Sequence, residues 1–173
     1  MLELMPLLEE AGVPKGLLSV LPSRNTSKLV DHLLHDPRVR LVSFTGSTEV
    51  GRKLLKVASD QVLKTSMELG GNAPLIIFDD ADINIAIEGA LVAKMRNLGE
   101  ACTAANRIYV HEDIAQEFKS KFSERMGALK VGNGLDKSVD VGPLVNAETR
   151  DKVKYFVDDA LSKGAELCVG GQT

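Results

Sequence analysis

The sequence of 173 residues contains no tryptophan, and aromatic residues make up only 4% of it. A platform for stacking nucleic-acid bases needs several aromatic side chains, so we do not expect one. The charges nearly cancel, with 21 Lys and Arg against 24 Asp and Glu and a net charge of -3. Such a balance gives no general attraction to nucleic acid or to an anionic membrane. No apolar run is long enough to span a bilayer, so we expect no membrane or nucleic-acid partner.

Cysteine is scarce as well. Two cysteines are too few for a disulfide framework, and free thiols are typical of a reducing compartment. The first residues include Glu3 and Glu9, where a signal peptide would carry basic residues. We therefore expect a cytoplasmic protein. The three histidines, His32, His35 and His111, are scattered and lack a matching cysteine pattern, so we expect no metal site.

Helical and extended patterns alternate along the chain. Helices are expected near residues 2–11, 26–36, 48–58, 83–95, 114–126 and 147–161, and strands at 39–44, 63–69, 74–78, 107–111 and 166–169. Strands that alternate with helices through short connections are typical of an α/β fold with a parallel sheet. Two helices precede the first strand and nothing covers the last one, so we expect a piece of a larger protein. Gly70 and Gly71 are the expected switch between two lobes.

The first candidate site lies where a strand meets a helix. Phe44 ends an apolar run, Gly46 turns the chain, and Ser47 and Thr48 begin a helical pattern. The free N–H groups of a helix N-terminus bind anions, so this junction is a candidate seat for a pyrophosphate. The segment matches neither the dinucleotide glycine pattern nor the P-loop pattern. The simpler interpretation, that Ser47 or Thr48 only caps the helix, is favoured on local evidence.

The second candidate is Glu68, at the end of an apolar strand and followed by Leu69, Gly70 and Gly71. Ligands of α/β sheets lie beyond the carboxyl ends of the strands, and paired glycines let the backbone approach a ligand closely. A carboxylate placed there could act as a general base. The alternative is a solvated glutamate at a strand end.

The third candidate is Cys102, in a glycine-containing loop between a helix and a strand. A thiolate is a strong nucleophile, and a loop can expose it. The alternative is a small buried residue, the common fate of a free cysteine. We expect that fate for Cys168, which lies in the strand predicted at residues 166–169.

Together and in this order, the segments at residues 44–48, 67–71 and 99–102 resemble the aldehyde dehydrogenase superfamily. They are similar to its phosphate-contacting junction, its glutamate signature and its cysteine signature, at matching spacing. The resemblance covers essentially the whole chain. Residues 95–107 look most like those of succinate-semialdehyde dehydrogenases.

The resemblance implies a role for each candidate. Cys102 would attack an aldehyde to form a thiohemiacetal, loss of hydride to NAD or NADP would leave a thioester, and Glu68 would activate water to release the acid. The backbone N–H of Cys102 would help to hold the oxyanion. The residues implied in cofactor binding are Gly46, Ser47, Thr48, Leu69 and Gly70.

The resemblance also implies the organisation of the protein. It implies an α/β fold made of parallel-sheet halves of two domains, truncated at both ends: residues 1–70 from a Rossmann-like cofactor domain and residues 71–173 from the catalytic domain. The whole protein would be a homo-oligomer acting on a small aldehyde, and this chain alone would show little or no turnover. Glu100 replaces the glutamine usual beside the cysteine. Two alternatives stay open: a coenzyme A-acylating enzyme that uses the same cysteine, and a structural fragment without catalysis.

Overall fold

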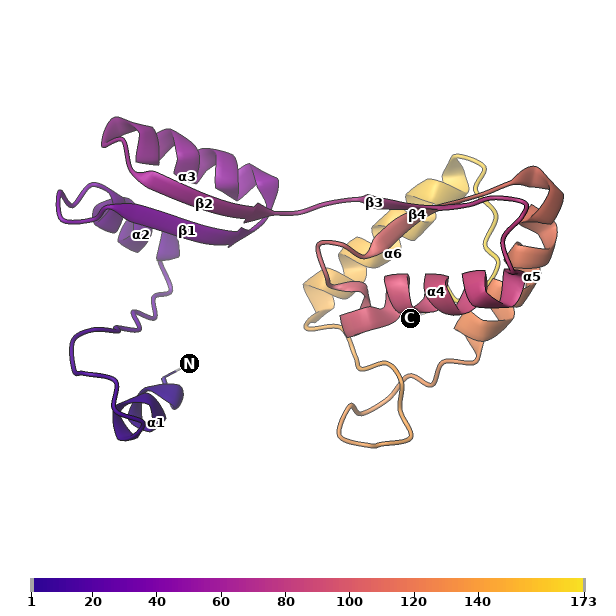
Figure 1. The fold of residues 1–173 in the computed structure, drawn as a ribbon, viewed down its shortest axis with the longest axis horizontal. Coiled ribbons are helices and arrows are strands. Elements are labelled where there is room, and N and C mark those ends of the chain that lie inside the picture. Colours follow the sequence, from indigo (N-terminus) through magenta and orange to yellow (C-terminus); the bar gives the residue numbers. More distant parts are fainter. Residues whose placement is uncertain (1, 173) are drawn as a thin grey trace. The chain divides into compact units, whose positions relative to one another are not determined.

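The computed structural model describes residues 2–172, which divide into two compact units, one ending at Gly70 and the other beginning at Gly71. Each unit is built on its own pair of parallel strands, as the α/β prediction required (Figure 1). Within residues 2–172, no helix is both long enough and apolar enough to cross a membrane.

The first unit packs a helix against a pair of strands. Its elements are α1 (Leu4–Glu10), α2 (Thr26–Leu34), β1 (Leu41–Gly46), α3 (Thr48–Asp60) and β2 (Lys64–Leu69). β1 pairs with β2 from Leu41 opposite Lys64 to Gly46 opposite Leu69, and α3 connects the two strands. Gly51 permits close packing of α3, because a Cβ atom there would lie 2.5 Å from Cδ2 of Leu69. The carboxyl ends of β1 and β2 therefore meet at one edge.

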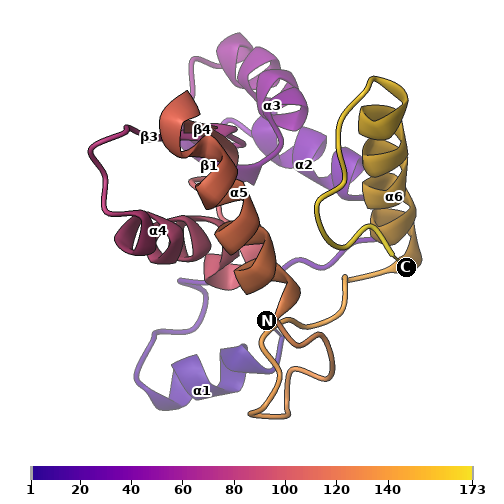
Figure 2. The ribbon, with the colours of Figure 1, turned by 90° about the vertical axis from the view of Figure 1, so that its right-hand side faces the viewer.

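The second unit repeats the strand, helix, strand order. Its elements are β3 (Ala73–Ile77), α4 (Ile83–Met95), the 3-10 turn η1 (Arg96–Gly99), β4 (Ala105–Val110), α5 (Glu112–Gly127) and α6 (Ala147–Ser162). β3 and β4 are parallel, with a register shift between Ala73 and Pro74. Figure 2 shows α4 and α5 crossing next to each other, in agreement with their contacts. This arrangement places the loop that follows α4 at the start of β4.

The core of the second unit fixes that arrangement. Its buried members come from β3, α4 and α5 and are Ile77, Ile87, Ala90, Leu91 and Phe118. Phe118 also stacks on Phe122, with ring centroids 5.3 Å apart. Burial of each large apolar side chain contributes about 1.5–3 kcal/mol. The α4–β4 loop is therefore held at both ends by well-packed elements.

Most helices begin at a residue whose side chain caps them. Oxygen atoms of Asn25, Ser47, Asp82 and Asn146 accept hydrogen bonds from backbone N–H groups two or three residues further on. Each bond satisfies a donor without an intrahelical partner, and such a cap contributes about 1 kcal/mol. The helices predicted to begin near residues 26, 48 and 147 are confirmed.

The strand predicted at residues 166–169 is wrong. The segment after α6 is irregular in the described structure, and Glu166 instead pairs with Lys119 on α5 at 2.6 Å. A strand exists only with a neighbour to share its hydrogen bonds, and apolar residues in a row do not supply one.

Candidate functional site

Ser47 is the N-cap of α3. Its Oγ atom accepts a hydrogen bond from the N–H of Val50 at 3.3 Å, and its extended backbone leads directly from β1 into the helix. The acidic residue of the first turn, Glu49, pairs with Lys53 at 2.6 Å, and this hydrogen bond lowers the pKa of the Glu49 carboxyl. The cap explains Ser47 without a ligand. The N–H groups of Thr48 and Glu49 precede the intrahelical ladder and so remain suited to an anion.

Glu68 lies near the end of β2, directly beside the β1 end that leads to Ser47. The register places Thr45 opposite Glu68 and Gly46 opposite Leu69. Glu68 is exposed, whereas Leu69 is partly buried against α3. The structure thus brings the first two predicted motifs to one strand edge of the first unit.

This edge stays the predicted seat for the pyrophosphate part of a dinucleotide. A helix N-terminus with a hydroxyl cap faces the carboxyl ends of two parallel strands, the place where α/β sheets bind such groups. Within the first unit, Gly70 has no described atom beyond its chain neighbours within 4 Å of where its Cβ would stand. The residues that would hold the cofactor there are Gly46, Ser47, Thr48, Leu69 and Gly70.

Cys102 lies in the α4–β4 loop, and its side chain is exposed. The loop has an unusual backbone: Asn97, Leu98 and Gly99 follow one another with φ values of 50°, 58° and 78°. Glycine adopts this left-handed conformation freely, and asparagine tolerates it. Leucine does not, and a strained residue of this kind costs about 1–3 kcal/mol. Strain held in a loop beside an exposed thiol is typical of functional sites.

Gly71 lies against the backbone of Cys102. A Cβ atom at Gly71 would be 2.8 Å from the carbonyl oxygen of Cys102, closer than a real Cβ contact allows. A side chain at this position would push the cysteine backbone away. The second glycine of the pair therefore serves the cysteine loop directly, in addition to any role as a linker.

Arg96 is a candidate that the sequence alone does not single out, within the segment at residues 95–107. It follows α4 directly, and its Nη2 atom donates a hydrogen bond to Oγ1 of Thr103 at 3.3 Å, next to Cys102. Arg96, Ala101 and Thr103 are among the residues lining a cavity of about 150 Å³. The arrangement places a guanidinium beside the loop that presents the thiol.

Arg107 and Cys168 lie outside the α4–β4 loop that carries Cys102. Arg107 donates a hydrogen bond from Nη2 to the backbone carbonyl of Asn72 at 2.7 Å, which ties β4 to the residues before β3. Cys168 was expected to be packed inside a strand, but it is exposed in an irregular segment. The packing prediction for Cys168 is wrong, because it depended on the strand at residues 166–169.

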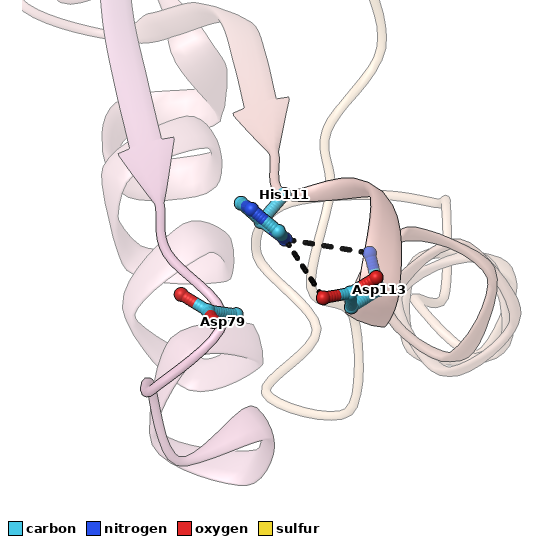
Figure 3. Close-up of side chains that lie close together, drawn as sticks. All are labelled: Asp79, His111 and Asp113. Carbon is cyan, nitrogen blue, oxygen red and sulfur yellow. Dashed lines mark hydrogen bonds and ion pairs between the residues drawn. The ribbon is translucent and has the colours of Figure 1, made fainter.

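A cluster absent from the sequence prediction lies at the carboxyl ends of β3 and β4. Ligand atoms of Asp79, His111 and Asp113 all lie within 4.8 Å of one another (Figure 3). Nδ1 of His111 accepts a hydrogen bond from the N–H of Asp113 at 3.4 Å and lies 3.6 Å from its carboxylate, so it caps α5. The negative charge of Asp113 also suits the first turn of a helix. Capping accounts for the position of His111, and the helix dipole favours that of Asp113, so neither residue needs an ion to explain it.

The two proposed catalytic groups belong to different units. Glu68 is on β2 of the first unit, and Cys102 is on the α4–β4 loop of the second. The backbone of Cys102 lies against Gly71, its neighbour Thr103 is bonded to Arg96, and Glu68 lies beside β1. Their pairing across the units stays a prediction.

The sequence matches the model of the family described as "Aldehyde dehydrogenase family" over residues 1–173. It is 54% identical over 162 residues to a succinate-semialdehyde dehydrogenase of Paenarthrobacter nicotinovorans, covering 94% of this chain and 36% of that protein. It is also 46% identical over 171 residues to a 3-sulfolactaldehyde dehydrogenase of Pseudomonas putida, covering 99% of this chain and 35% of that protein. The chain therefore spans about a third of the length of these relatives.

Solved structures of aldehyde dehydrogenases are similar to this chain as well. A succinate-semialdehyde dehydrogenase from Burkholderia pseudomallei superposes with a TM-score of 0.94 at 44% identity, over 99% of this chain and 35% of that one. A betaine aldehyde dehydrogenase from Staphylococcus aureus, in complex with NAD+, gives a TM-score of 0.91 at 36% identity, over 98% of this chain and 34% of that one.

Proposed function

Since the chain belongs to the aldehyde dehydrogenase family, we propose that the full-length protein oxidises succinate semialdehyde to the carboxylic acid with NAD or NADP. The observation that carries the proposal is the exposed thiol of Cys102 on a strained loop, in a chain that matches this family from end to end. Relatives named for NADP and a related structure with bound NAD+ support either dinucleotide.

In the proposed reaction, the thiolate of Cys102 attacks the aldehyde carbon, and a new C–S bond gives a thiohemiacetal. Bound dinucleotide supplies the acceptor for the hydride that then leaves this carbon, since no side chain can accept it. The product on the cysteine is a thioester. The exposed position of Cys102 supports the first step, because an aldehyde can reach the sulfur.

Glu68 is proposed to take a proton from the water that hydrolyses the thioester. The C–S bond then breaks, the acid leaves, and the sulfur is restored as a thiolate. The position of Glu68 at the carboxyl end of β2 supports this role, because it shares that edge with the proposed dinucleotide site.

Arg96 is proposed to recognise the acidic end of the substrate. The relatives are named for succinate semialdehyde and 3-sulfolactaldehyde, each of which has an anionic group at the end opposite the aldehyde. A guanidinium binds a carboxylate or sulfonate through charge-assisted hydrogen bonds. Arg96 is exposed beside the cysteine loop, whereas the guanidinium of Arg107 is already bonded to Asn72.

The test is the rate of dinucleotide reduction by the full-length protein with succinate semialdehyde, and with butanal as its uncharged counterpart. At low substrate concentration, we expect faster turnover of succinate semialdehyde than of butanal. Cys102→Ala should lower the rate at least about a thousandfold, because it removes the nucleophile. Cys168→Ala is the matched control and should change little, since that exposed cysteine lies outside the loop. Normal oxidation by the Cys102→Ala variant would refute the proposal.

We also propose a cytoplasmic homo-oligomer. Both cysteines are free thiols, which is typical of reducing compartments. Large apolar side chains such as Ile85, at 72% exposure, and Leu135, at 92%, suit surfaces that are covered in a larger assembly. Light scattering of the full-length protein distinguishes an oligomer from a monomer.

A further inference from the structure

The loop between α4 and β4 holds a shape that its own sequence does not favour. Three successive left-handed residues, Asn97 to Gly99, precede Cys102, and Leu98 remains 43% exposed instead of being anchored in the core. A strained segment with little packing of its own relaxes unless neighbouring groups hold it. A neighbouring group must therefore hold the loop between α4 and β4.

Lys94 spans the whole loop. It lies in the last turn of α4, and its Nζ atom donates a hydrogen bond to Oδ1 of Asn106 in β4 at 2.7 Å. This bond joins the residues on either side of the loop, so that opening of the loop must break it. A charged donor makes such a bond stronger than a neutral one.

The same lysine also contacts the middle of the loop. A Cβ atom at Gly99 would lie 3.0 Å from the carbonyl oxygen of Lys94 and 3.5 Å from its Nζ atom. Gly99 therefore passes directly beside Lys94, where its positive φ favours glycine and a Cβ atom would make a tight contact. Lys94 therefore lies before the left-handed turn, approaches Gly99 within it, and bonds to Asn106 after it.

We infer that Lys94 is a positioning residue for Cys102, which through its bond to Asn106 holds the left-handed loop in the shape that presents the thiol. The inference rests on the proposed function for the role of Cys102 as nucleophile. Arg96 and Thr103 form a second, weaker link inside the loop at 3.3 Å. Lys94 acts on the loop as a whole, because its partner lies in the following strand.

The test compares variants of the full-length protein by hydrogen exchange of residues 97–104 and by steady-state kinetics. Lys94→Met should raise exchange in this loop about tenfold and lower kcat about tenfold, the effect of losing one hydrogen bond from a charged group. The KM for the dinucleotide should stay unchanged. Lys94→Arg should recover most of both losses, because a guanidinium can still donate to Asn106.

A double-mutant cycle shows whether the two residues act as a pair. Asn106→Leu removes the acceptor and should reproduce the Lys94→Met effects, and the double variant should be no worse than either single one. Asn106→Leu also tests the inference from the other side if Lys94→Met fails to fold. Losses that multiply in the double variant would overturn the inference.

Lys119→Met is the matched control. It removes another lysine of the same unit, bonded to Glu166 at 2.6 Å, and should leave loop exchange and kcat unchanged. Equal effects of Lys94→Met and Lys119→Met, or no effect of Lys94→Met on loop exchange, would overturn the inference. Absence of aldehyde oxidation in the unchanged protein would instead refute the proposed function, and the exchange comparison would still decide the role of Lys94.

Discussion

The junction at Ser47 and the loop at Cys102 differ in what explains their shape. Ser47 has an extended backbone and a side-chain cap, and a helix start alone accounts for both. The Cys102 loop has a left-handed Leu98, a glycine pressed against the cysteine carbonyl, and hydrogen bonds across it from Lys94 and Arg96. Left-handed residues of this kind cluster at functional sites, which supports the proposed role of the loop.

Apart from loss of the nucleophile itself, the largest expected effect comes from Gly71→Ala. The new Cβ would meet the carbonyl oxygen of Cys102 at 2.8 Å, so the loop must shift. A displacement of about 1 Å at a reacting group can cost about a hundredfold in rate, and we expect a fall in kcat of that size. Gly89→Ala is the matched control: it lies in α4, a Cβ there would meet no described atom within 4 Å apart from its chain neighbours and its own helix backbone, and activity should be kept. Equal kcat values for the two variants would show that the contact at Gly71 does not position the thiol.

A smaller effect is expected from Arg96→Met. Losing the proposed contact to the acidic group should raise KM for succinate semialdehyde about 10- to 100-fold, with little change for butanal. Arg107→Met should affect both aldehydes alike, because its guanidinium supports the backbone of Asn72. The ratio of KM for succinate semialdehyde to KM for butanal, measured in both variants, checks this assignment. A rise in this ratio in the Arg107 variant alone would assign the acidic group to Arg107.

The smallest effect is expected at Ser47, at the junction of β1 and α3. Ser47→Ala should lower the free energy of unfolding by about 1 kcal/mol, because the N–H of Val50 loses its acceptor. Ser47→Asn should restore stability, since asparagine is also a good cap. Urea unfolding measures the stability, and the KM for the dinucleotide tests the phosphate role separately. An Ala variant with normal stability but weak dinucleotide binding would show that Ser47 serves the ligand and not the helix.

The elements that the sequence predicts well are those with local causes. Apolar residues at helical spacing define α4 and α5, and cap residues such as Asn25 and Asn146 mark where helices begin. The segment at residues 166–169 has a composition typical of a strand. A strand also needs a neighbouring strand to bond with, and the residues of the segment itself do not reveal one.

In the candidate site, too, the sequence indicates some features and only the structure shows the others. Cys102 and Glu68 are candidates because three segments together resemble one family at matching spacing, whereas residue type alone left a simpler interpretation open for each. The left-handed Leu98 could not be predicted, since leucine carries no preference for that conformation. The bond from Lys94 to Asn106 joins residues twelve positions apart and follows from how α4 packs beside β4.

The central claim is that Cys102 carries the acyl group during turnover. The most direct measurement uses full-length protein with Glu68→Gln, in which slower hydrolysis should let the thioester accumulate. After addition of succinate semialdehyde and dinucleotide, acid quenching and peptide mass spectrometry should find a succinyl group on the peptide with Cys102 and none on the peptide with Cys168. Labelling of both cysteines alike, or of neither while the aldehyde is consumed, would contradict the account.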